Sequence, residues 1–452
     1  MNYVNYYLLK LEKFFFKMTI EPVCALLVML FIPFIKIYRR LTIDRTKLPR
    51  LMWGPEPLIN NKYYSQCMKK AEYKSTTLMS SYFNVINKKD DFDLYYSDFK
   101  IFYSGRFKFL RQLNESFFPY LLFLYSLFKF DIFHFSFSGG LLSKTLLKRM
   151  EAQLTKFSGC KIVSLAYGGD FYVSSNIIEP CWQHTILIHY PNYALNELEI
   201  KKRVDYWNKR SDIIINGMQI DGLGRWSVLP FRSEVIDIDK LPEKIKYSNN
   251  DGKNAPVCIA HAPNHRFIKG TEYLEKAIDD LREEGYDIEF VLIEKMQNSE
   301  LLELLSAKAD ILFDQINLGY AMSAIEGFAI GLPVMTNLEN REYVRLFQRY
   351  SYLEECPAVS ISHETLTDSL RSLIKSPQLR KELGEAGKRY AKKYHSFQTG
   401  KYLFGKVYDK IWQNKDVDLL NMFHPLLKES YNNQSPKVKH PLVKNKIPVN
   451  LL

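Results

Sequence analysis

The sequence predicts an α/β protein with two globular domains, and three observations indicate this. The chain has 452 residues, more than one hydrophobic core usually organises. After residue 50, short apolar runs alternate with longer amphipathic stretches, the pattern of parallel strands joined by helical crossovers. The polar segment at 240–256 interrupts this alternation, which then begins again. We therefore expect two Rossmann-like domains, residues 46–240 and 241–412.

The composition restricts the function classes. Hydrophobic residues make up 46% and charged residues 25%, which argues against a polytopic membrane protein and against wholesale disorder. The net charge of +12 predicts an anionic partner: a phosphorylated small molecule, an anionic lipid surface or nucleic acid. Nucleic acid ranks last, because the basic residues are spread along the chain among acids. The six cysteines form no CxxC pair, so we expect no zinc cluster, no disulfide framework and a reducing compartment.

Residues 1–45 carry a membrane signal. The uncharged run from Pro22 to Ile35 is shorter than the roughly 20 residues of a spanning helix, and Pro33 interrupts it. No small-residue cleavage site follows, so a removable signal peptide is not favoured. The pattern favours an interfacial anchor on an anionic leaflet, with a buried helix of the first domain as the alternative. Three basic residues follow the run directly: Lys36, Arg39 and Arg40.

Several strands of the first domain are predicted to end in glycine-bearing loops, where ligands of open α/β sheets gather. One loop, AYGGDFYV, contains Asp170, which suits the binding of an acceptor or sugar hydroxyl; capping of a turn is the alternative. For His134 the alternatives are a side chain that faces the cleft and one that packs in the core among Phe133, Phe135 and Phe137; packing is favoured. The strand candidates lie within 50–65, 130–140, 161–173 and 211–217.

The second domain repeats the alternation. Strands are predicted within 256–263, 287–294 and 309–315, and a helix over 269–285 ends at Gly285. Residues 364–412 have helical periodicity. Residues 413–452 are polar and predict a basic, loosely ordered tail.

The segment LGYAMSAIEGFAIGLPVM, residues 318–335, contains one ionisable side chain, Glu326. A helix beginning near Gly319, Tyr320 and Ala321 would present backbone amides that suit a phosphate. Glu326 lies about 10 Å further along the axis, so an extended nucleotide diphosphate could reach both places, with the acid accepting from the ribose hydroxyls. The alternative is an acid on a solvated helix face.

Two stretches resemble a known family. AIEGFAIGLPVM resembles the EAMAxGxPVI signature of retaining GT-B nucleotide-sugar glycosyltransferases, the Glu-x7-Glu group, and HAPNHRFIKGTEYLEKAI resembles the basic loop of the same domain. The resemblance covers about residues 256–412. It implies a GT-B fold, in which two Rossmann-like domains face a central cleft and the last helix can return to the first domain.

The resemblance also implies roles for particular residues. Glu326 would hold the donor ribose, and Arg266 and Lys269 would hold the donor diphosphate, although ordinary surface charges are the alternative for these two. WGPEPLINNKYYSQCMKKA resembles the first glycine-bearing loop of a GT-B acceptor domain, where Gly54 would let the backbone approach the donor. Fixed cations and helix-end amides would stabilise the leaving diphosphate, so no metal and no cofactor beyond the nucleotide-sugar co-substrate are expected.

One position departs from the family pattern. Eight residues before Glu326, where the family has its first Glu, this chain has Leu318, and the nearest upstream acid is Asp314. The departure leaves the donor-sugar contacts and catalysis open. The residues around this position, DQ followed by LGY and then Glu326, resemble those of a divergent branch of capsule and cell-surface polysaccharide transferases.

The resulting hypothesis is a membrane-associated hexosyltransferase of polysaccharide biosynthesis. It would move a sugar from a nucleotide diphosphate donor to a growing surface glycan or lipid-linked acceptor, with retention. The enzyme would be cytoplasmic, peripherally attached to the anionic inner face of the membrane, and would bind no nucleic acid. The alternatives are a non-catalytic nucleotide-binding or scaffold subunit, a sugar-nucleotide epimerase or phosphorylase-like enzyme, and a basic nucleic-acid binder.

Overall fold

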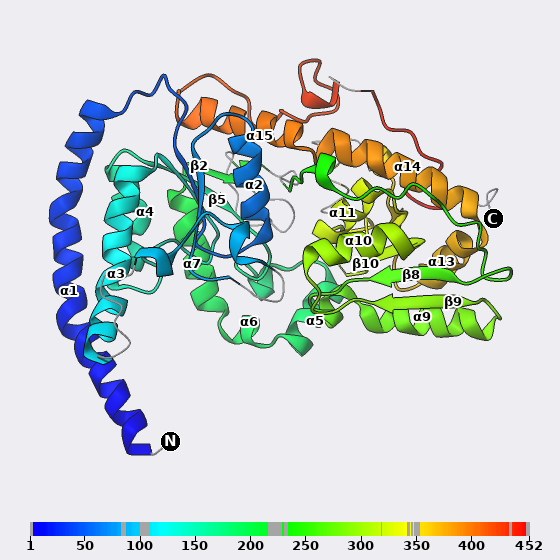
Figure 1. Ribbon diagram of the computed structural model, residues 1–452, viewed down its shortest axis with the longest axis horizontal. Coiled ribbons are helices and arrows are strands. Elements are labelled where there is room, and N and C mark those ends of the chain that lie inside the picture. Colours follow the sequence, from blue (N-terminus) through cyan, green and yellow to red (C-terminus); the bar gives the residue numbers. More distant parts are fainter. Residues whose placement is uncertain are drawn as a thin grey trace.

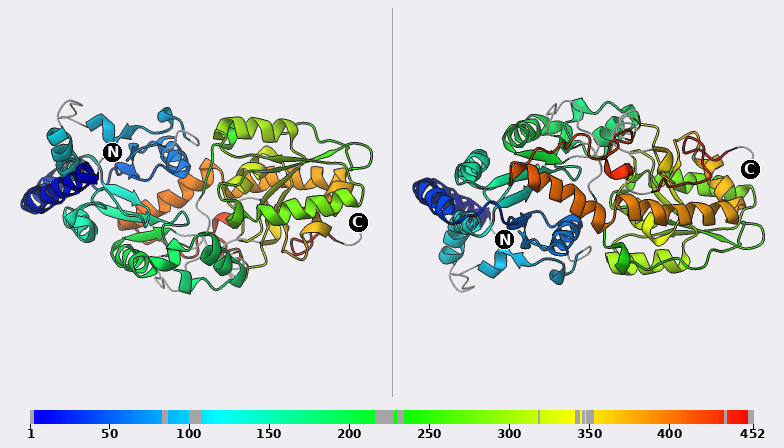
Figure 2. Two further views of the ribbon diagram at one scale, coloured as in Figure 1. Left: turned by 90° about the horizontal axis from the view of Figure 1, so that it is seen from below. Right: turned by 90° about the horizontal axis from the view of Figure 1, so that it is seen from above.

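Two α/β units lie side by side, and a long helix runs along the outer side of the first (Figures 1 and 2). The computed structural model describes residues 3–82, 87–99, 108–215, 228–229, 234–317, 319–340, 344, 347, 353–433 and 436–448. Of these, only the backbone is described in segments 3–17, 108–115 and 228–229 and at residue 432.

The first unit is built on a parallel sheet with the order β3-β2-β1-β4-β5-β6-β7. Its central strands are short apolar runs buried on both faces, as expected where helices cover a parallel sheet. The strands are β1 (Leu51–Trp53), β2 (Ser75–Met79), β3 (Leu94–Tyr95), β4 (Ile132–Phe135), β5 (Lys161–Leu165), β6 (Ile213–Ile215) and β7 (Val228–Leu229). The helices are α2 (Ile59–Lys69), α3 (Lys108–Lys129), α4 (Glu151–Phe157), α5 (Pro180–His189), α6 (Asn192–Leu195) and α7 (Glu197–Arg210).

The second unit has a parallel sheet with the order β12-β11-β10-β8-β9. Together the two sheets confirm the predicted fold class, α/β with two Rossmann-like domains. The strands are β8 (Val257–His261), β9 (Ile288–Leu292), β10 (Ile311–Gln315), β11 (Val334–Thr336) and β12 (Val359–Ser360). The helices are α8 (Arg266–Lys269), α9 (Thr271–Glu283), α10 (Asn298–Lys308), α11 (Met322–Ile330), α13 (Leu366–Lys375), α14 (Pro377–Tyr394) and α15 (Phe397–Ile411).

Helix α15 leaves the second domain and packs against α2 of the first. In Figure 2 the orange helix α15 lies in the first unit beside the blue helix α2. The ring of Phe404 meets the Trp53 ring edge-on with centroids 5.1 Å apart, and the Tyr408 hydroxyl lies 2.9 Å from Nε2 of His134. His134 itself is buried and stacks on Trp53, which confirms the expectation that it packs in the core. Burial lowers the pKa of His134 to about 3, so its ring is neutral.

The tail after residue 412 is ordered against the protein where it is described, although its sequence predicted loose order. Phe423, Tyr431 and Val438 are buried, and the Val438 N–H donates to the Glu355 carboxylate at 3.0 Å. Glu355 in turn pairs with buried Lys393 at 2.8 Å. A few apolar side chains spaced widely along a polar segment give no periodic signal, yet they suffice to hold it to the surface.

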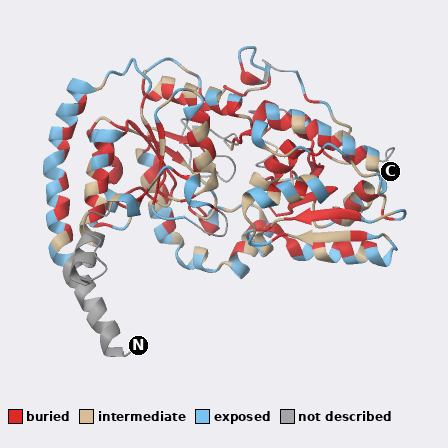
Figure 3. Ribbon diagram, viewed as in Figure 1, coloured by how far each residue is buried: buried red, intermediate tan, exposed pale blue. Residues whose placement is uncertain are grey.

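The long helix α1 (Tyr3–Thr42) lies along α3, with Pro22 and Pro33 inside it. From Met18 onward one side of the helix is buried and the opposite side is exposed (Figure 3). The buried side includes Cys24, Val28 and Ile32, which follow helical spacing. Met18–Thr42 is long and apolar enough to cross a membrane, and 33% of its most apolar window is buried against the protein.

Buried Arg39 fixes the end of α1 to the first domain. Its guanidinium donates to Asp131 at 2.7 Å and to the carbonyl oxygens of Leu127 and Phe130 at 2.7 and 2.9 Å. Asp131 also accepts from the Arg50 guanidinium at 2.9 Å, so two cations share one carboxylate. The sequence had assigned Arg39 to a basic flank facing lipid; its side chain instead faces the protein because α1 turns that residue onto α3.

Candidate functional site

The strand order places the site-bearing loops at one crevice in each sheet. In the second sheet β9 lies on one side of β8 and β10 on the other, so the loops after β8 and β10 border a topological switch point. In the first sheet the corresponding switch lies between β1 and β4. The segments that follow these strands carry Lys269, Gly319 and Gly54. Ligands of open sheets bind beyond the carboxyl ends of the strands, so the three residues lie where a ligand is expected.

The two carboxyl edges meet at the domain junction. The Phe267 ring, in the short helix α8 that follows β8, stacks on the His189 ring of α5 with centroids 3.7 Å apart. The Tyr63 hydroxyl of α2 lies 3.4 Å from Oδ1 of Asn298, the first residue of α10. Loops from both sheets therefore border the same region.

Glu326 lies in the buried part of α11, at this junction. Its side chain is 2% exposed, which excludes the solvated helix face. Asn298 Nδ2 donates to Glu326 Oε1 at 2.8 Å, and Asn298 also contacts Tyr63, so a short chain of contacts joins the acid to the first domain. Burial, with a smaller effect from the charge of Asp314, raises the pKa of Glu326 to about 7.

Asp314 at the end of β10 organises the N-terminus of α11. Its carboxylate accepts from the backbone N–H of Ala321 at 2.7 Å, from Ser323 Oγ at 2.5 Å and from Lys269 Nζ at 3.1 Å. The sequence had assigned the Ala321 amide to a phosphate. The structure gives that amide to Asp314, which also lies against the positive end of the helix dipole.

The neighbouring loop is fixed by its backbone. The carbonyl oxygen of Gly319 accepts from Thr336 Oγ1 at 2.7 Å and from the Gln315 side chain. The Tyr320 side chain is fully buried, with its hydroxyl 3.1 Å from Nε2 of His395, so its ring belongs to the core and only its backbone could meet a ligand. Leu318, which replaces the first acid of the family pattern, lies outside the described residues.

The two predicted diphosphate-binding cations differ in exposure. The Lys269 side chain is 8% exposed and is paired with Asp314. The Arg266 side chain is 39% exposed and its guanidinium pairs with Glu275 at 2.7 Å and with Glu294 at 3.7 Å. Both cations therefore have carboxylate partners in this state, and neither is an isolated charge facing the junction.

Asp170 caps a turn. It is 2% exposed and accepts from the backbone N–H groups of Phe137, Tyr167 and Gly168 at 2.9, 3.1 and 2.9 Å. Burial raises the pKa of Asp170 to about 7 against the lowering effect of these hydrogen bonds. The geometry matches the turn-capping alternative, because the carboxylate is enclosed by its own loops.

Gly54 is required by a close approach within the first domain. Its φ is +144°, and a Cβ at this position would lie 2.1 Å from the carbonyl oxygen of Leu78 in β2. The glycine therefore has a packing reason that is separate from any ligand.

Sequence reasoning did not find Asn298 or Tyr63. Tyr63 lies in the stretch that follows Gly54 but was given no role there, Asn298 belongs to no motif, and their proximity depends on how the two domains dock. No group of three or more His, Cys, Asp or Glu that could hold a metal ion occurs among the residues the structure describes.

The chain was compared with known proteins in three ways. No family model matches it, and no curated protein sequence matches it. Among solved structures, the catalytic domain of starch synthase IV from Arabidopsis thaliana, bound to ADP and acarbose, aligns with a TM-score of 0.46 and 8% identity. The alignment covers 82% of this chain and 100% of that one.

Two further structures are similar in the same range. The glycosyltransferase of kitacinnamycin has a TM-score of 0.39 and 11% identity, covering 80% of this chain and 99% of its own. The wall teichoic acid polymerase TagF has a TM-score of 0.36 and 12% identity, covering 92% of this chain and 100% of its own.

Proposed function

We propose that the chain is a glycosyltransferase that moves a sugar from a nucleotide diphosphate donor to a hydroxyl of a surface glycan or lipid-linked acceptor, with retention. One observation supports it most: the buried acid Glu326 lies at the junction of two Rossmann-like domains, and its hydrogen-bond partner Asn298 contacts Tyr63 of the first domain. The resemblance of its segment to a ribose-binding motif gives that acid a ligand.

Glu326 has the chemistry that a ribose requires. An ionised carboxylate offers about four acceptor positions, of which Asn298 occupies one. Two neighbouring hydroxyls of a ribose would donate to the others and would favour the ionised form, lowering a pKa that burial holds near 7. Donor binding is then coupled to deprotonation of this acid.

The donor diphosphate is assigned to the loop after β8. Lys269 has three N–H donors, one of which goes to Asp314, and Arg266 is exposed enough to exchange Glu275 for a phosphate. The backbone of Gly319 and Tyr320 would border the same group, whereas the Ala321 amide is bound to Asp314. As the diphosphate leaves, these cations would stabilise its growing negative charge, and the acceptor hydroxyl would attack the anomeric carbon from the same face.

Peripheral membrane attachment is proposed from the outer side of α1. Its exposed apolar side chains point away from the side that packs on α3, and the basic residue Arg40 is exposed as well. The ammonium of Lys36 lies over the Phe157 ring of α4. Since the inner side is covered by protein, the helix would lie in the interface of an anionic leaflet. The exposed apolar residues are Met18, Val23, Leu26, Leu27, Met29, Leu30, Phe31, Phe34, Ile37, Tyr38 and Leu41.

A ligand screen tests the donor site. Thermal shifts with uridine, guanosine and other nucleoside diphosphates are measured on the native chain, on Glu326→Ala and on Arg266→Ala. Glu300→Gln, an exposed change on α10, is the matched control. We expect one nucleotide to stabilise the native chain and the control, and to stabilise the two site variants less. Absence of any shift, or equal shifts in all four proteins, would falsify the assignment.

A non-catalytic nucleotide-binding subunit is the second candidate, because Leu318 stands where the family has an acid. The two functions differ in turnover. Release of free nucleoside diphosphate from the bound donor, in the presence of lipid-linked or glycan acceptors, supports transfer; donor binding without release over a panel of acceptors supports the subunit.

A further inference from the structure

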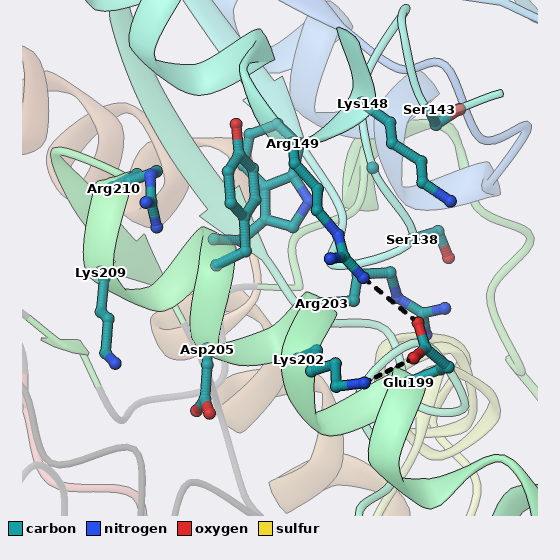
Figure 4. A pocket seen from close by; sticks show the side chains of 13 residues that line it. Ser138, Ser143, Lys148, Arg149, Glu199, Lys202, Arg203, Asp205, Lys209 and Arg210 are labelled. Carbon is teal, nitrogen blue, oxygen red and sulfur yellow. Dashed lines mark hydrogen bonds and ion pairs between the residues drawn. The ribbon is translucent and has the colours of Figure 1, made fainter. Parts of the chain in front are cut away.

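A cavity of about 560 Å³ lies in the first domain, outside the Glu326 junction (Figure 4). It is bordered by α7, by the short 3-10 helix η3 (Leu146–Arg149) and by the loop that follows β4. Its volume falls in the range of small-molecule sites and exceeds what a lone phosphate fills. None of the residues that the sequence had proposed for a site lines it.

The wall of this cavity is strongly basic. Only Glu199 and Asp205 oppose its cations among the described lining residues. Four of the cations lie on α7 and two on η3, so two separate elements supply them. They are Lys148, Arg149, Lys202, Arg203, Lys209 and Arg210.

The internal ion pairs leave positive charge unbalanced. Glu199 is shared by Lys202 at 2.8 Å and Arg149 at 3.5 Å, as the dashed lines in Figure 4 mark. For Lys148 and Lys209, no carboxylate of the described residues lies within ion-pair distance. Like charges gathered without counter-charges repel one another, which an anion would relieve.

Arg203 connects the cavity to the carboxyl edge of the first sheet. Its Nη2 donates to the backbone oxygen of Asp170 at 2.8 Å, and its Nε is buried without a hydrogen-bond partner in the described structure. A guanidinium tied at one nitrogen and unsatisfied at another is oriented for a further acceptor. It lies beside the loop that holds Ser138, which also lines the cavity.

We propose that this cavity binds a phosphorylated saccharide, with the phosphate or pyrophosphate among Lys148, Lys202 and Arg203. Charge-assisted hydrogen bonds from Lys and Arg suit phosphate oxygens. The half-buried ring of Tyr206 lines the same space. The Arg210 guanidinium lies over one face of this ring, 4.6 Å from its centroid, so a sugar would stack on the other face. Anion binding here is independent of the proposed transfer; identifying the bound saccharide as the acceptor rests on it.

Binding of inorganic pyrophosphate and of a hexose 1-phosphate to the full chain is measured by calorimetry at low and high salt. Lys148→Glu and Lys202→Glu reverse charges in the wall, and Lys381→Glu makes the same change at an exposed position of α14 that does not line the cavity. We expect saturable, salt-sensitive binding that falls roughly tenfold in each wall variant and is unchanged in the control. Circular dichroism verifies that the variants fold.

A second measurement, co-sedimentation with vesicles, distinguishes a lipid-linked phosphate from a soluble one. Co-sedimentation with phosphatidylcholine vesicles that carry a prenyl pyrophosphate, lost in the wall variants, identifies a lipid-linked pyrophosphate as the source. Hexose 1-phosphate binding without such retention identifies a soluble one. No binding of either anion, or equal binding in wall and control variants, overturns the proposal. If anion binding is equal in the wall and control variants and nucleotide binding is intact, the anion binds at the donor site and the proposed function stands.

Discussion

Two buried carboxylates, Asp170 in the first domain and Glu326 in the second, are held in different ways. Both are 2% exposed, and burial raises the pKa of each to about 7. Asp170 accepts from three backbone amides of its own loops, whereas Glu326 accepts from the side-chain amide of Asn298. A carboxylate whose acceptor positions are filled by backbone stabilises a loop, and one with positions left can bind a ligand. The difference in partners, more than burial or pKa, separates the two roles.

The largest expected effect is on stability at Asp170. Asp170→Ala leaves three backbone N–H groups without their acceptor, so we expect the free energy of unfolding to fall by about 3 kcal/mol. Urea denaturation measures it. Asp239→Ala, at an exposed position, serves as the control and should change stability by less than about 0.5 kcal/mol. A similar small loss at Asp170 would mean that its carboxylate is not a loop cap.

Glu326→Gln should weaken nucleotide binding much more than it changes stability. The glutamine oxygen can still accept from Asn298, so stability near pH 4, where the acid is largely protonated in both folded and unfolded chains, should change by less than about 1 kcal/mol. Affinity for the stabilising nucleotide should fall roughly tenfold or more, because a neutral acceptor replaces a charged one. Calorimetric titration and urea denaturation of the same preparation measure both. Large destabilisation with unchanged affinity would assign Glu326 to the core.

The pH dependence of donor affinity sharpens the comparison further. With the pKa of Glu326 raised to about 7, the free protein is mostly protonated there below neutrality. If the ribose binds the ionised form, affinity rises by up to roughly tenfold between pH 6 and pH 8. Titrations across this range, with Glu326→Gln as the reference that cannot ionise, measure the change. A profile shared by both proteins would assign the dependence to another group.

The same pKa shift fixes the sign of a stability effect. The folded-state pKa of Glu326 lies above its unfolded value, so its contribution is fully present below about pH 4 and is lost as pH rises through about 7. Relative to Glu326→Gln, the native chain should lose at most about 3 kcal/mol over that interval. Denaturation at several pH values measures it, and a pH-independent difference would contradict the shift.

The smallest effect is expected from Tyr63→Phe. The hydroxyl lies 3.4 Å from Asn298, a long hydrogen bond, so its loss should weaken nucleotide binding by about threefold at most through the position of Asn298. Asn298→Ala should act more strongly, because it removes the partner of Glu326 itself. Equal effects of the two changes would indicate that Tyr63 contacts the ligand directly.

The sequence predicts the class of the fold because strands and helices leave periodic signals, and the polar segment after residue 240 separates the halves. It also places Glu326 in an apolar helix. It could not show that Asp314, seven residues before Ala321, takes the amide reserved for a phosphate, since a cap depends on the path of the loop. The link from Glu326 through Asn298 to Tyr63 depends on domain docking, which no local pattern encodes. The basic cavity joins η3 to α7, which are some 50 residues apart, as the separation of Arg149 and Glu199 shows.

Helix α15 has a consequence for how the protein is made. Phe404 and Tyr408 pack on Trp53 and His134, and the Trp412 indole donates to the Lys47 carbonyl oxygen at 3.1 Å. A ribosome synthesises the first domain well before these side chains, so the emerging domain has one side of its core open until α15 has left the exit tunnel. The first domain can therefore complete its core only after most of the second domain has been synthesised. In a nascent chain stopped before residue 397, the side of the Trp53 ring that Phe404 covers is left exposed.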